Sequence, residues 1–183
     1  LGHAIMCGEP FISGDEPFYV LLGDVLVPDN DCLPRLKAVH EKYGGSVIAV
    51  EPVPEEFVSR YGVIAGREVE EGVWEVSDLV EKPPVNEAPS NLAIFGRYLL
   101  TPKVMEILPK VEAGRGGEIQ LTDGIAQLIA TEGVYAYRYE GKRYDCGSKL
   151  GYLQATVEYA LKHPELKDDF RDYLLGTVCT RGL

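Results

Sequence analysis

The chain has no long hydrophobic run, few cysteines and few basic residues. No apolar segment approaches the roughly 20 residues of a membrane-spanning helix, so no membrane partner is expected. Its 4 cysteines are scattered, without a CxxC pair or a Cys/His cluster, which argues against a zinc site. Scattered cysteines and the lack of a visible signal peptide favour a reducing, cytoplasmic location over a secreted disulfide framework.

Basic residues are outnumbered by acidic ones, 18 to 29, which gives a net charge of -11. Non-specific binding to DNA or RNA depends on clustered Lys and Arg, so no nucleic-acid partner is expected. A small phosphorylated substrate is not excluded, because a bound metal ion and one well-placed lysine can offset its charge locally.

The 183 residues are 45% hydrophobic and 26% charged, which is typical of one globular domain. The first residue is Leu1 rather than Met, and we expect the chain to be a piece of a longer protein.

Strand-like and helix-like segments alternate along the chain. The apolar run 18–22 predicts a strand buried on both faces of a parallel sheet, and residues 32–43 show helical spacing before Gly44. Residues 46–53 predict the next strand, which completes a right-handed βαβ unit. The other expected elements are a hairpin over 61–65 and 73–76, strands over 91–100 and 134–139, and helices over 119–130, 150–161 and 165–175. The fold class is therefore α/β, with a mixed, mainly parallel sheet flanked by helices.

Two aspartates lie where strand-like segments end. Asp24 follows the run 18–22, and Asp145 lies in the continuation of the strand at 134–139. Either could begin a turn or cap a helix, but ligands of α/β sheets bind beyond the carboxyl ends of strands. Because magnesium prefers oxygen ligands, the pair predicts a Mg²⁺ site that also holds substrate phosphates.

The dipeptide Glu81-Lys82 follows an apolar pair and precedes two prolines. Lys82 alone would usually be a surface lysine, but beside Glu81 it can offset phosphate charge while the carboxylate accepts hydrogen bonds from sugar hydroxyls. Gly62 could simply begin a strand, or it could let a sugar ring approach the backbone.

Seven short segments match the motifs of one enzyme family. They are Leu1–Ala4, Leu22–Asp24, Tyr61–Ile64, Val80–Pro83, Ser90–Ile94, Gly117–Asp123 and Tyr144–Gly147. Over residues 1 to about 161, the chain resembles the bacterial UTP–glucose-1-phosphate uridylyltransferases (UDP-glucose pyrophosphorylases). The segments Gly117–Asp123 and Tyr144–Gly147 are specific to this branch, whereas the Glu-Lys-Pro and Gly-Asp elements occur in other sugar-phosphate nucleotidyltransferases.

The resemblance implies the Rossmann-like nucleotide-diphospho-sugar transferase fold. Residues 1–183 would be the C-terminal two thirds of one such domain, because the family's glycine-rich loop, GxGTRxLPxTK, does not occur in this sequence. Without that loop we expect the 183 residues alone to be prone to aggregation, to bind UTP weakly and to show no uridylyl transfer.

The resemblance also implies the reaction and its catalytic residues. A phosphate oxygen of glucose 1-phosphate attacks the α-phosphorus of UTP, which gives UDP-glucose and pyrophosphate without a covalent enzyme intermediate. Lys82, Asp24 and Asp145 would be the catalytic residues, and the two aspartates would bind the Mg²⁺ cofactor.

The substrate-binding residues follow from the same motifs. Gly2 would lie near the uracil, Gly62 and Ile94 would shape the sugar pocket, Glu81 would bind glucose hydroxyls and Lys82 would contact the sugar phosphate. A homo-oligomer, either a dimer or a tetramer, is expected.

Two alternatives remain open at this point. One is a related transferase for another nucleotide or sugar, such as a thymidylyltransferase. The other is a non-catalytic module that binds sugar nucleotides.

Overall fold

The computed structural model describes residues 1–28 and 31–181, and the chain divides into two compact units. The first unit comprises Leu1–Leu22 and the described part of 29–141, and the second comprises Gly23–Pro28 and the described part of 142–183. The assignment of 1–183 to one domain stays a prediction. Among the described helices, none has both the length and the apolar character needed to cross a membrane.

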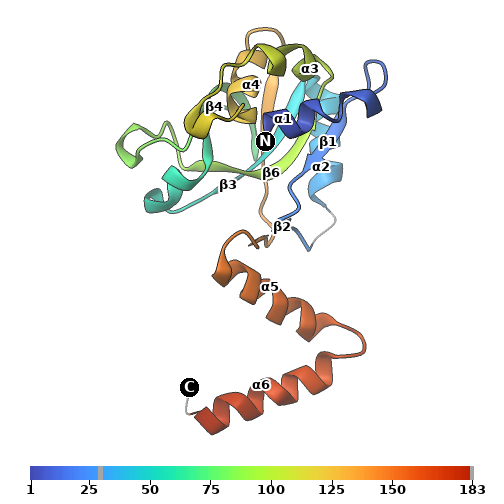
Figure 1. Ribbon diagram of the computed structural model, residues 1–183, viewed down its shortest axis with the longest axis vertical. Helices are drawn as coiled ribbons and strands as arrows, with labels where there is room; N and C mark the ends of the chain where they lie inside the picture. The colour runs from blue at the N-terminus through green and yellow to red at the C-terminus, as the bar shows by residue number, and fades with distance from the viewer. Residues whose placement is uncertain (29–30, 182–183) are drawn as a thin grey trace. The chain divides into compact units, whose positions relative to one another are not determined.

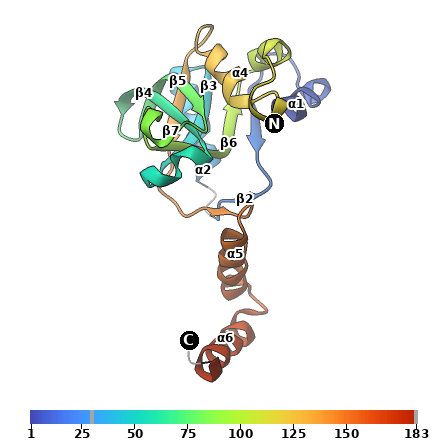
Figure 2. The ribbon, with the colours of Figure 1, turned by 60° about the vertical axis from the view of Figure 1, so that its left-hand side comes forward.

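The first unit is built around a six-stranded mixed sheet (Figure 1). In spatial order the strands are β1 (Phe18–Leu21), β6 (Leu92–Leu100), β3 (Ser46–Pro52), β7 (Val134–Arg138), β5 (Val73–Glu81) and β4 (Gly62–Glu70). A further pairing between Val63 and Ala93 joins β4 to β6. Figure 2 shows the sheet turned from the view of Figure 1; β3 and β7 are the two central strands of its order, and β5 follows β7.

The expectation of a mainly parallel sheet is wrong. Within the described part of the chain, only β3 and β7 pair in parallel, and the remaining ladders of this sheet are antiparallel. A connection as short as Glu71-Gly72 can join β4 to β5 only as an antiparallel hairpin. The strands β1 and β3 do run in the same direction, as a βαβ unit requires, but β6 lies between them.

Strand β1 also differs from the prediction of a strand buried on both faces. It ends the sheet order and pairs with β6, and its burial alternates, so that Tyr19 is 39% and Leu21 is 50% exposed. Phe18 and Val20 pack against the core from the other face. A short apolar run is therefore compatible with a sheet edge as well as with a buried centre.

Helices and short helical turns surround the sheet. They are α1 (Gly2–Met6), α2 (Cys32–Tyr43), α3 (Lys103–Ile107) and α4 (Leu121–Leu128), with 3₁₀ turns at Glu9–Phe11, Glu55–Arg60, Val85–Glu87, Leu108–Lys110 and Arg115–Gly117. The predicted helix over 32–43 is confirmed. Its buried positions Cys32, Leu36 and Val39 recur on one face, and it ends where Gly44 adopts a φ of 75°. The core includes apolar residues of α4, β3 and β6, such as Ile125, Ile48 and Leu100.

A buried carboxylate ties three elements of the first unit together. The Glu132 side chain is 8% exposed, and its Oε1 accepts hydrogen bonds of 2.8 Å from both Ser46 and Thr101. Lys103 Nζ lies 3.7 Å from Oε2. Glu132 therefore connects the start of β3, the end of β6 and the start of α3.

Replacing Glu132 with alanine is expected to lower the free energy of unfolding by about 3 kcal/mol. The change leaves two hydroxyls without their acceptor, and each unsatisfied buried group costs about 1–3 kcal/mol. Urea unfolding measures the difference, with the exposed Glu112→Ala as the control, expected to stay within about 0.5 kcal/mol of wild type. Equal losses in both variants would contradict a structural role for this network.

The second unit combines a short ladder with two helices. Strand β2 (Val25–Leu26) pairs antiparallel with β8 (Tyr144–Asp145), and the helices are α5 (Lys149–Lys162) and α6 (Lys167–Arg181). Both helices are confirmed, and α6 extends further than the predicted 165–175. Helix α5 begins at Ser148, whose hydroxyl accepts a hydrogen bond from the Gly151 N–H at 3.0 Å.

Candidate active site

The residues predicted to bind the sugar meet at one point of the first unit. A Cβ placed on Gly62 would lie 3.1 Å from Glu81 Oε2, 3.3 Å from Ile94 Cδ1 and 3.3 Å from Thr122 Oγ1. Gly62 and Glu81 are also direct partners across the β4–β5 ladder. Glycine at position 62 therefore leaves open the space between a carboxylate, an apolar side chain and a hydroxyl.

The two oxygens of Glu81 have different partners. Thr122 Oγ1 donates a hydrogen bond to Oε2 at 2.6 Å, and Lys82 Nζ lies 3.5 Å from Oε1. The Glu81 side chain is 18% exposed, whereas that of Lys82 is 46% exposed. The carboxylate is thus held in place while the ammonium group remains accessible to a ligand.

Lys82 adopts an unusual backbone conformation directly after β5. Its φ is 47°, and it is the one non-glycine residue with positive φ in the described part of the chain. Its N–H donates a hydrogen bond to the Tyr61 carbonyl at 3.0 Å, which holds this turn beside the start of β4. Such backbone conformations cost free energy and often occur at functional sites.

Thr122 is a site residue that the sequence analysis did not single out. It lies in the first turn of α4, where a threonine normally passes for a polar surface residue, but it is 8% exposed and bonded to Glu81. The signal that could have found it is its place in the segment Gly117–Asp123.

The Glu81 carboxylate contributes to the raised pKa values of both Tyr98 and Asp123. Burial raises the pKa of the Tyr98 hydroxyl, and the negative charge of Glu81 adds to the shift. Burial and then Glu81 likewise raise the pKa of Asp123. The phenol of Tyr98 therefore stays protonated at neutral pH.

Asp24 and Asp145 come together in the second unit. The β2–β8 ladder pairs Val25 with Asp145, and the Cys146 N–H donates a hydrogen bond to the Asp24 carbonyl at 2.7 Å. A Cβ on Gly147 would lie 3.1 Å from Asp145 Oδ1 and 3.1 Å from Asp24 Oδ2, so these oxygens are no further apart than twice that distance. A two-residue antiparallel ladder, rather than the ends of two parallel strands, brings them together.

Comparison with protein families identifies the family to which these candidate site residues belong. Residues 1–162 match the model of the family described as "Nucleotidyl transferase". The chain belongs to the nucleotidyl transferase family. The match takes in the acids and the residues around Gly62 alike.

Individual relatives of this nucleotidyl transferase agree with the resemblance seen in its motifs. It is 49% identical to the UTP–glucose-1-phosphate uridylyltransferase of Staphylococcus epidermidis over 175 residues, which cover 95% of this chain and 60% of that protein. A crystal structure of UDP-glucose pyrophosphorylase complexed with UDP-glucose is similar, with a TM-score of 0.84 and 47% identity over 89% of this chain and 63% of that one. UTP-bound UGPase from Acinetobacter baumannii is also similar, with a TM-score of 0.81 and 42% identity over 95% of this chain and 61% of that one.

These similarities confirm the resemblance to the uridylyltransferase family and the Rossmann-like nucleotidyltransferase fold. The nucleotidyl transferase chain spans about 60% of the length of the curated relatives that it matches.

The donor set at Asp24 and Asp145 fits a magnesium ion. Both carboxylates face the space beside Gly147 that a side chain would fill, and the Gly147 N–H orients Asp145 by donating to Oδ1 at 3.0 Å. The described residues contain no group of three or more His, Cys, Asp or Glu side chains that could hold a metal. Mg²⁺ commonly takes one or two carboxylates and fills its other positions with water and substrate phosphates, so two acids are enough.

Gly2 packs tightly inside the first unit. It begins α1, its N–H donates a hydrogen bond to the Ile119 carbonyl at 2.9 Å, and a Cβ there would lie 2.8 Å from Ile119 Cγ2. Its N–H therefore already has a protein acceptor, and the contact with uracil stays a prediction.

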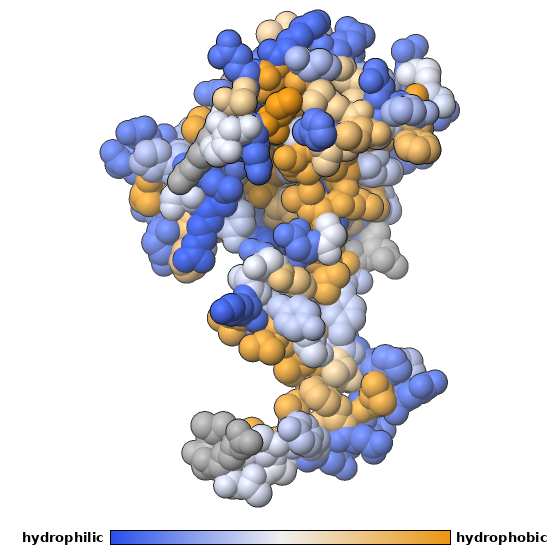
Figure 3. Space-filling view, viewed as in Figure 1, coloured by the Kyte–Doolittle hydropathy of each residue, from blue (hydrophilic) through white to orange (hydrophobic). Residues whose placement is uncertain are grey.

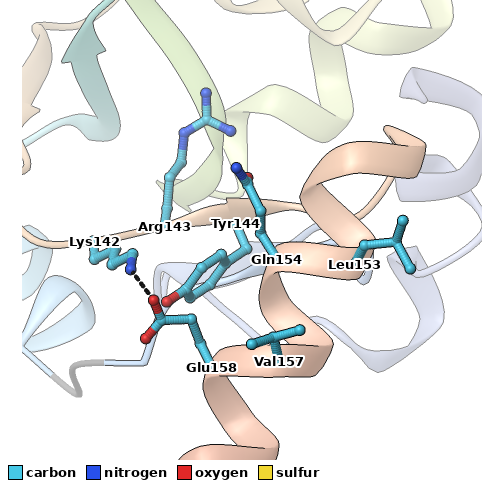
Figure 4. Close-up of a pocket in the computed structure, with 7 residues that line it drawn as sticks. All are labelled: Lys142, Arg143, Tyr144, Leu153, Gln154, Val157 and Glu158. Carbon is cyan, nitrogen blue, oxygen red and sulfur yellow. Dashed lines mark hydrogen bonds and ion pairs between the residues drawn. The ribbon is translucent and has the colours of Figure 1, made fainter. Parts of the chain in front are cut away.

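A cavity of about 400 Å³ lies in the second unit, between residues 142–144 and one face of α5 (Figure 4). Lys142 Nζ lies 2.7 Å from Glu158 Oε1, while Arg143 and Gln154 point away from this pair. The cavity contains none of the predicted site residues, although Tyr144 in its wall directly precedes Asp145.

Proposed function

We propose that this nucleotidyl transferase chain forms the sugar- and metal-binding part of a UTP–glucose-1-phosphate uridylyltransferase. The observation that supports this function best is the Glu81 carboxylate, fixed by Thr122, open toward Gly62 and adjacent to the Lys82 ammonium group. A carboxylate next to a cation suits a ligand that carries hydroxyls and a phosphate. Relatives named for this activity support the choice of glucose 1-phosphate and UTP as substrates.

The residues of the sugar pocket bind and orient glucose 1-phosphate. Glu81 accepts hydrogen bonds from ring hydroxyls, while Gly62 and Ile94 shape the space for the ring. Lys82 contacts the phosphate of glucose 1-phosphate and offsets its charge while a phosphate oxygen attacks the α-phosphorus of UTP. Gly2 lies near the uracil base. Catalysis of this kind consists mainly of positioning and charge compensation.

Asp24 and Asp145 would hold the Mg²⁺ ion. When bound, the ion offsets the negative charge of the phosphates and orients them. The triphosphate-binding loop of the family does not occur in these 183 residues, so activity is to be measured with the full-length protein.

We also propose self-association and a cytoplasmic location. Large apolar residues are exposed along α5 and α6, where Figure 3 shows orange surface in the lower part of the view. They are Leu150, Tyr152, Leu153, Tyr159, Leu161, Tyr173, Leu175 and Val178 on the two helices, and Leu166 between them. Exposed apolar surface of this kind supports a dimer or tetramer. The cysteines at 7, 32, 146 and 179 are free, which supports a reducing compartment.

Replacing Glu81 with glutamine tests the sugar-binding role. We expect the KM for glucose 1-phosphate to rise at least about tenfold, because a hydrogen bond to a charged group contributes about 1.5–3 kcal/mol. The KM for UTP should stay unchanged. The amide oxygen can still accept from Thr122, so the fold is retained.

Steady-state kinetics of the full-length protein measure both constants. Glu75→Gln, on the same strand, removes a carboxylate that pairs with Arg67 instead of facing the pocket, and serves as the matched control. A rise in the KM for UTP alone, or equal effects of the two variants, would contradict the assignment.

A further inference from the structure

The backbone of Asp145 is tied to the first turn of α5 through Ser148. The N–H and the hydroxyl of Ser148 both donate hydrogen bonds to the Asp145 carbonyl, at 3.2 Å and 3.0 Å. The same hydroxyl accepts a hydrogen bond from the Gly151 N–H at 3.0 Å. A serine hydroxyl has one proton and two lone pairs, so it can make both bonds at once. Ser148 therefore links the backbone of a proposed metal ligand to a helix.

Gly151 allows the Asp145 carbonyl to lie against this helix. A Cβ at position 151 would clash with the Asp145 carbonyl oxygen and would lie 2.9 Å from Ser148 Oγ. Gly151 is buried within α5, where glycine makes a helix less stable than alanine does. Helix stability therefore does not account for a glycine here, whereas the space that the carbonyl occupies does.

Further hydrogen bonds hold the Asp145 side chain and the backbone of Asp24. The Gly147 N–H donates to Asp145 Oδ1 at 3.0 Å, and the Cys146 N–H donates to the Asp24 carbonyl at 2.7 Å. The residues between Asp145 and α5 thus contact both acids. Because Ser148 and Gly151 fix this segment against α5, the helix supports both carboxylates.

We propose that Ser148 and Gly151 are positioning residues for the magnesium site, which fix the Asp145 carboxylate beside Asp24 and thereby set the affinity for the ion. The place of a carboxylate follows from that of its own backbone, so a carbonyl held by Ser148 also places the side chain. Groups that orient metal ligands typically change metal affinity or activity by about 10–100-fold when they are removed. The inference rests on the proposed function and deepens it, because it assigns the support of the metal ligands to α5.

A role of Ser148 in helix capping alone has different consequences. Serine is a favoured N-cap residue, and replacing it with alanine destabilises the helix that it begins. That loss would lower the melting temperature at every Mg²⁺ concentration, but it would leave the apparent Kd for Mg²⁺ unchanged.

The test is thermal unfolding of the full-length Ser148→Ala variant over a series of MgCl2 concentrations, without nucleotide or sugar. The rise of the melting temperature with concentration gives the apparent Kd for Mg²⁺. We expect this Kd to rise about tenfold in Ser148→Ala. Ser148→Thr keeps the hydroxyl and should stay within about twofold of wild type.

Two further variants separate positioning from helix stability. Ala160→Gly weakens the same helix away from Asp145, so it should lower the melting temperature and leave the Kd unchanged. Gly151→Ala favours the helix, but its methyl group needs the space of the Asp145 carbonyl. Its Kd should therefore rise at least about tenfold.

The outcomes distinguish this inference from the function on which it rests. A wild-type protein that responds to MgCl2, together with an unchanged Kd in Ser148→Ala, overturns the positioning role alone. An equal rise of the Kd in Ala160→Gly does the same, because the effect would then come from helix stability. A wild-type protein without any response to MgCl2 overturns the proposed metal site, and this inference with it. If Ser148→Ala folds poorly, Ser148→Gly, which caps a helix almost as well as serine, gives the same comparison.

Discussion

Replacing Asp145 with asparagine is expected to lower uridylyl transfer by the full-length protein on the order of 100-fold, with little change in stability. Asparagine has nearly the same shape, but it replaces one carboxylate oxygen by an amide nitrogen and removes the charge that a divalent cation requires. Asp24 alone would then face the space beside Gly147. Among the described residues, no third His, Cys, Asp or Glu side chain joins this pair in a metal-binding group.

Two measurements are needed because activity alone does not identify the cause. Turnover is titrated with Mg²⁺, and the melting temperature is recorded with and without the ion, since a ligand that binds only the folded state raises it. Asp145→Asn should need more Mg²⁺ and lose the thermal shift. Asp169→Asn, an exposed acid on α6, should behave like wild type. A normal Mg²⁺ response in Asp145→Asn would rule out the metal site.

Replacing Lys82 with alanine should lower kcat by about 10²–10³-fold. Removing one group that stabilises developing charge in a transition state typically has an effect of this size. Lys82 lies 3.5 Å from Glu81 and is about half exposed, so its ammonium group can reach a bound phosphate. Steady-state kinetics with UTP and glucose 1-phosphate measure the change in kcat.

The backbone at Lys82 offers a control for misfolding. Because φ is 47° there, Lys82→Gly removes the ammonium group while relieving backbone strain, whereas Lys82→Ala removes it and keeps the strain. Both variants should lose activity equally, with the glycine variant at least as stable. If Lys82→Gly recovered activity, the loss in Lys82→Ala would come from the backbone and the catalytic role would be wrong.

Much of the fold could be predicted where a pattern has one physical reading. Helix α2 followed from apolar residues at Cys32, Leu36 and Val39 before a glycine that ends it. The hairpin of β4 and β5 followed from two β-like runs around a charged, glycine-containing turn. Strand direction could not be predicted, because a short apolar run such as 18–22 looks alike in parallel and antiparallel sheets.

The candidate site, too, could be predicted from the sequence only in part. Glu81 stood out because it lies beside Lys82 between an apolar pair and two prolines, and Gly62 because it is a glycine at the start of a strand-like segment. The structure places them opposite each other. Thr122 did not stand out, since only its contact across 41 positions with Glu81 distinguishes it from a surface threonine. The pairing of Asp24 with Asp145 depends on a two-residue ladder, which is too short to leave a periodic pattern.

The most direct test of this account is pyrophosphate release by the full-length protein, measured with Mg²⁺, glucose 1-phosphate and either UTP or dTTP. The account predicts that UDP-glucose and pyrophosphate form in equal amounts with UTP, and that dTTP is a much poorer substrate. Absence of product with UTP, or faster turnover with dTTP than with UTP, would contradict it.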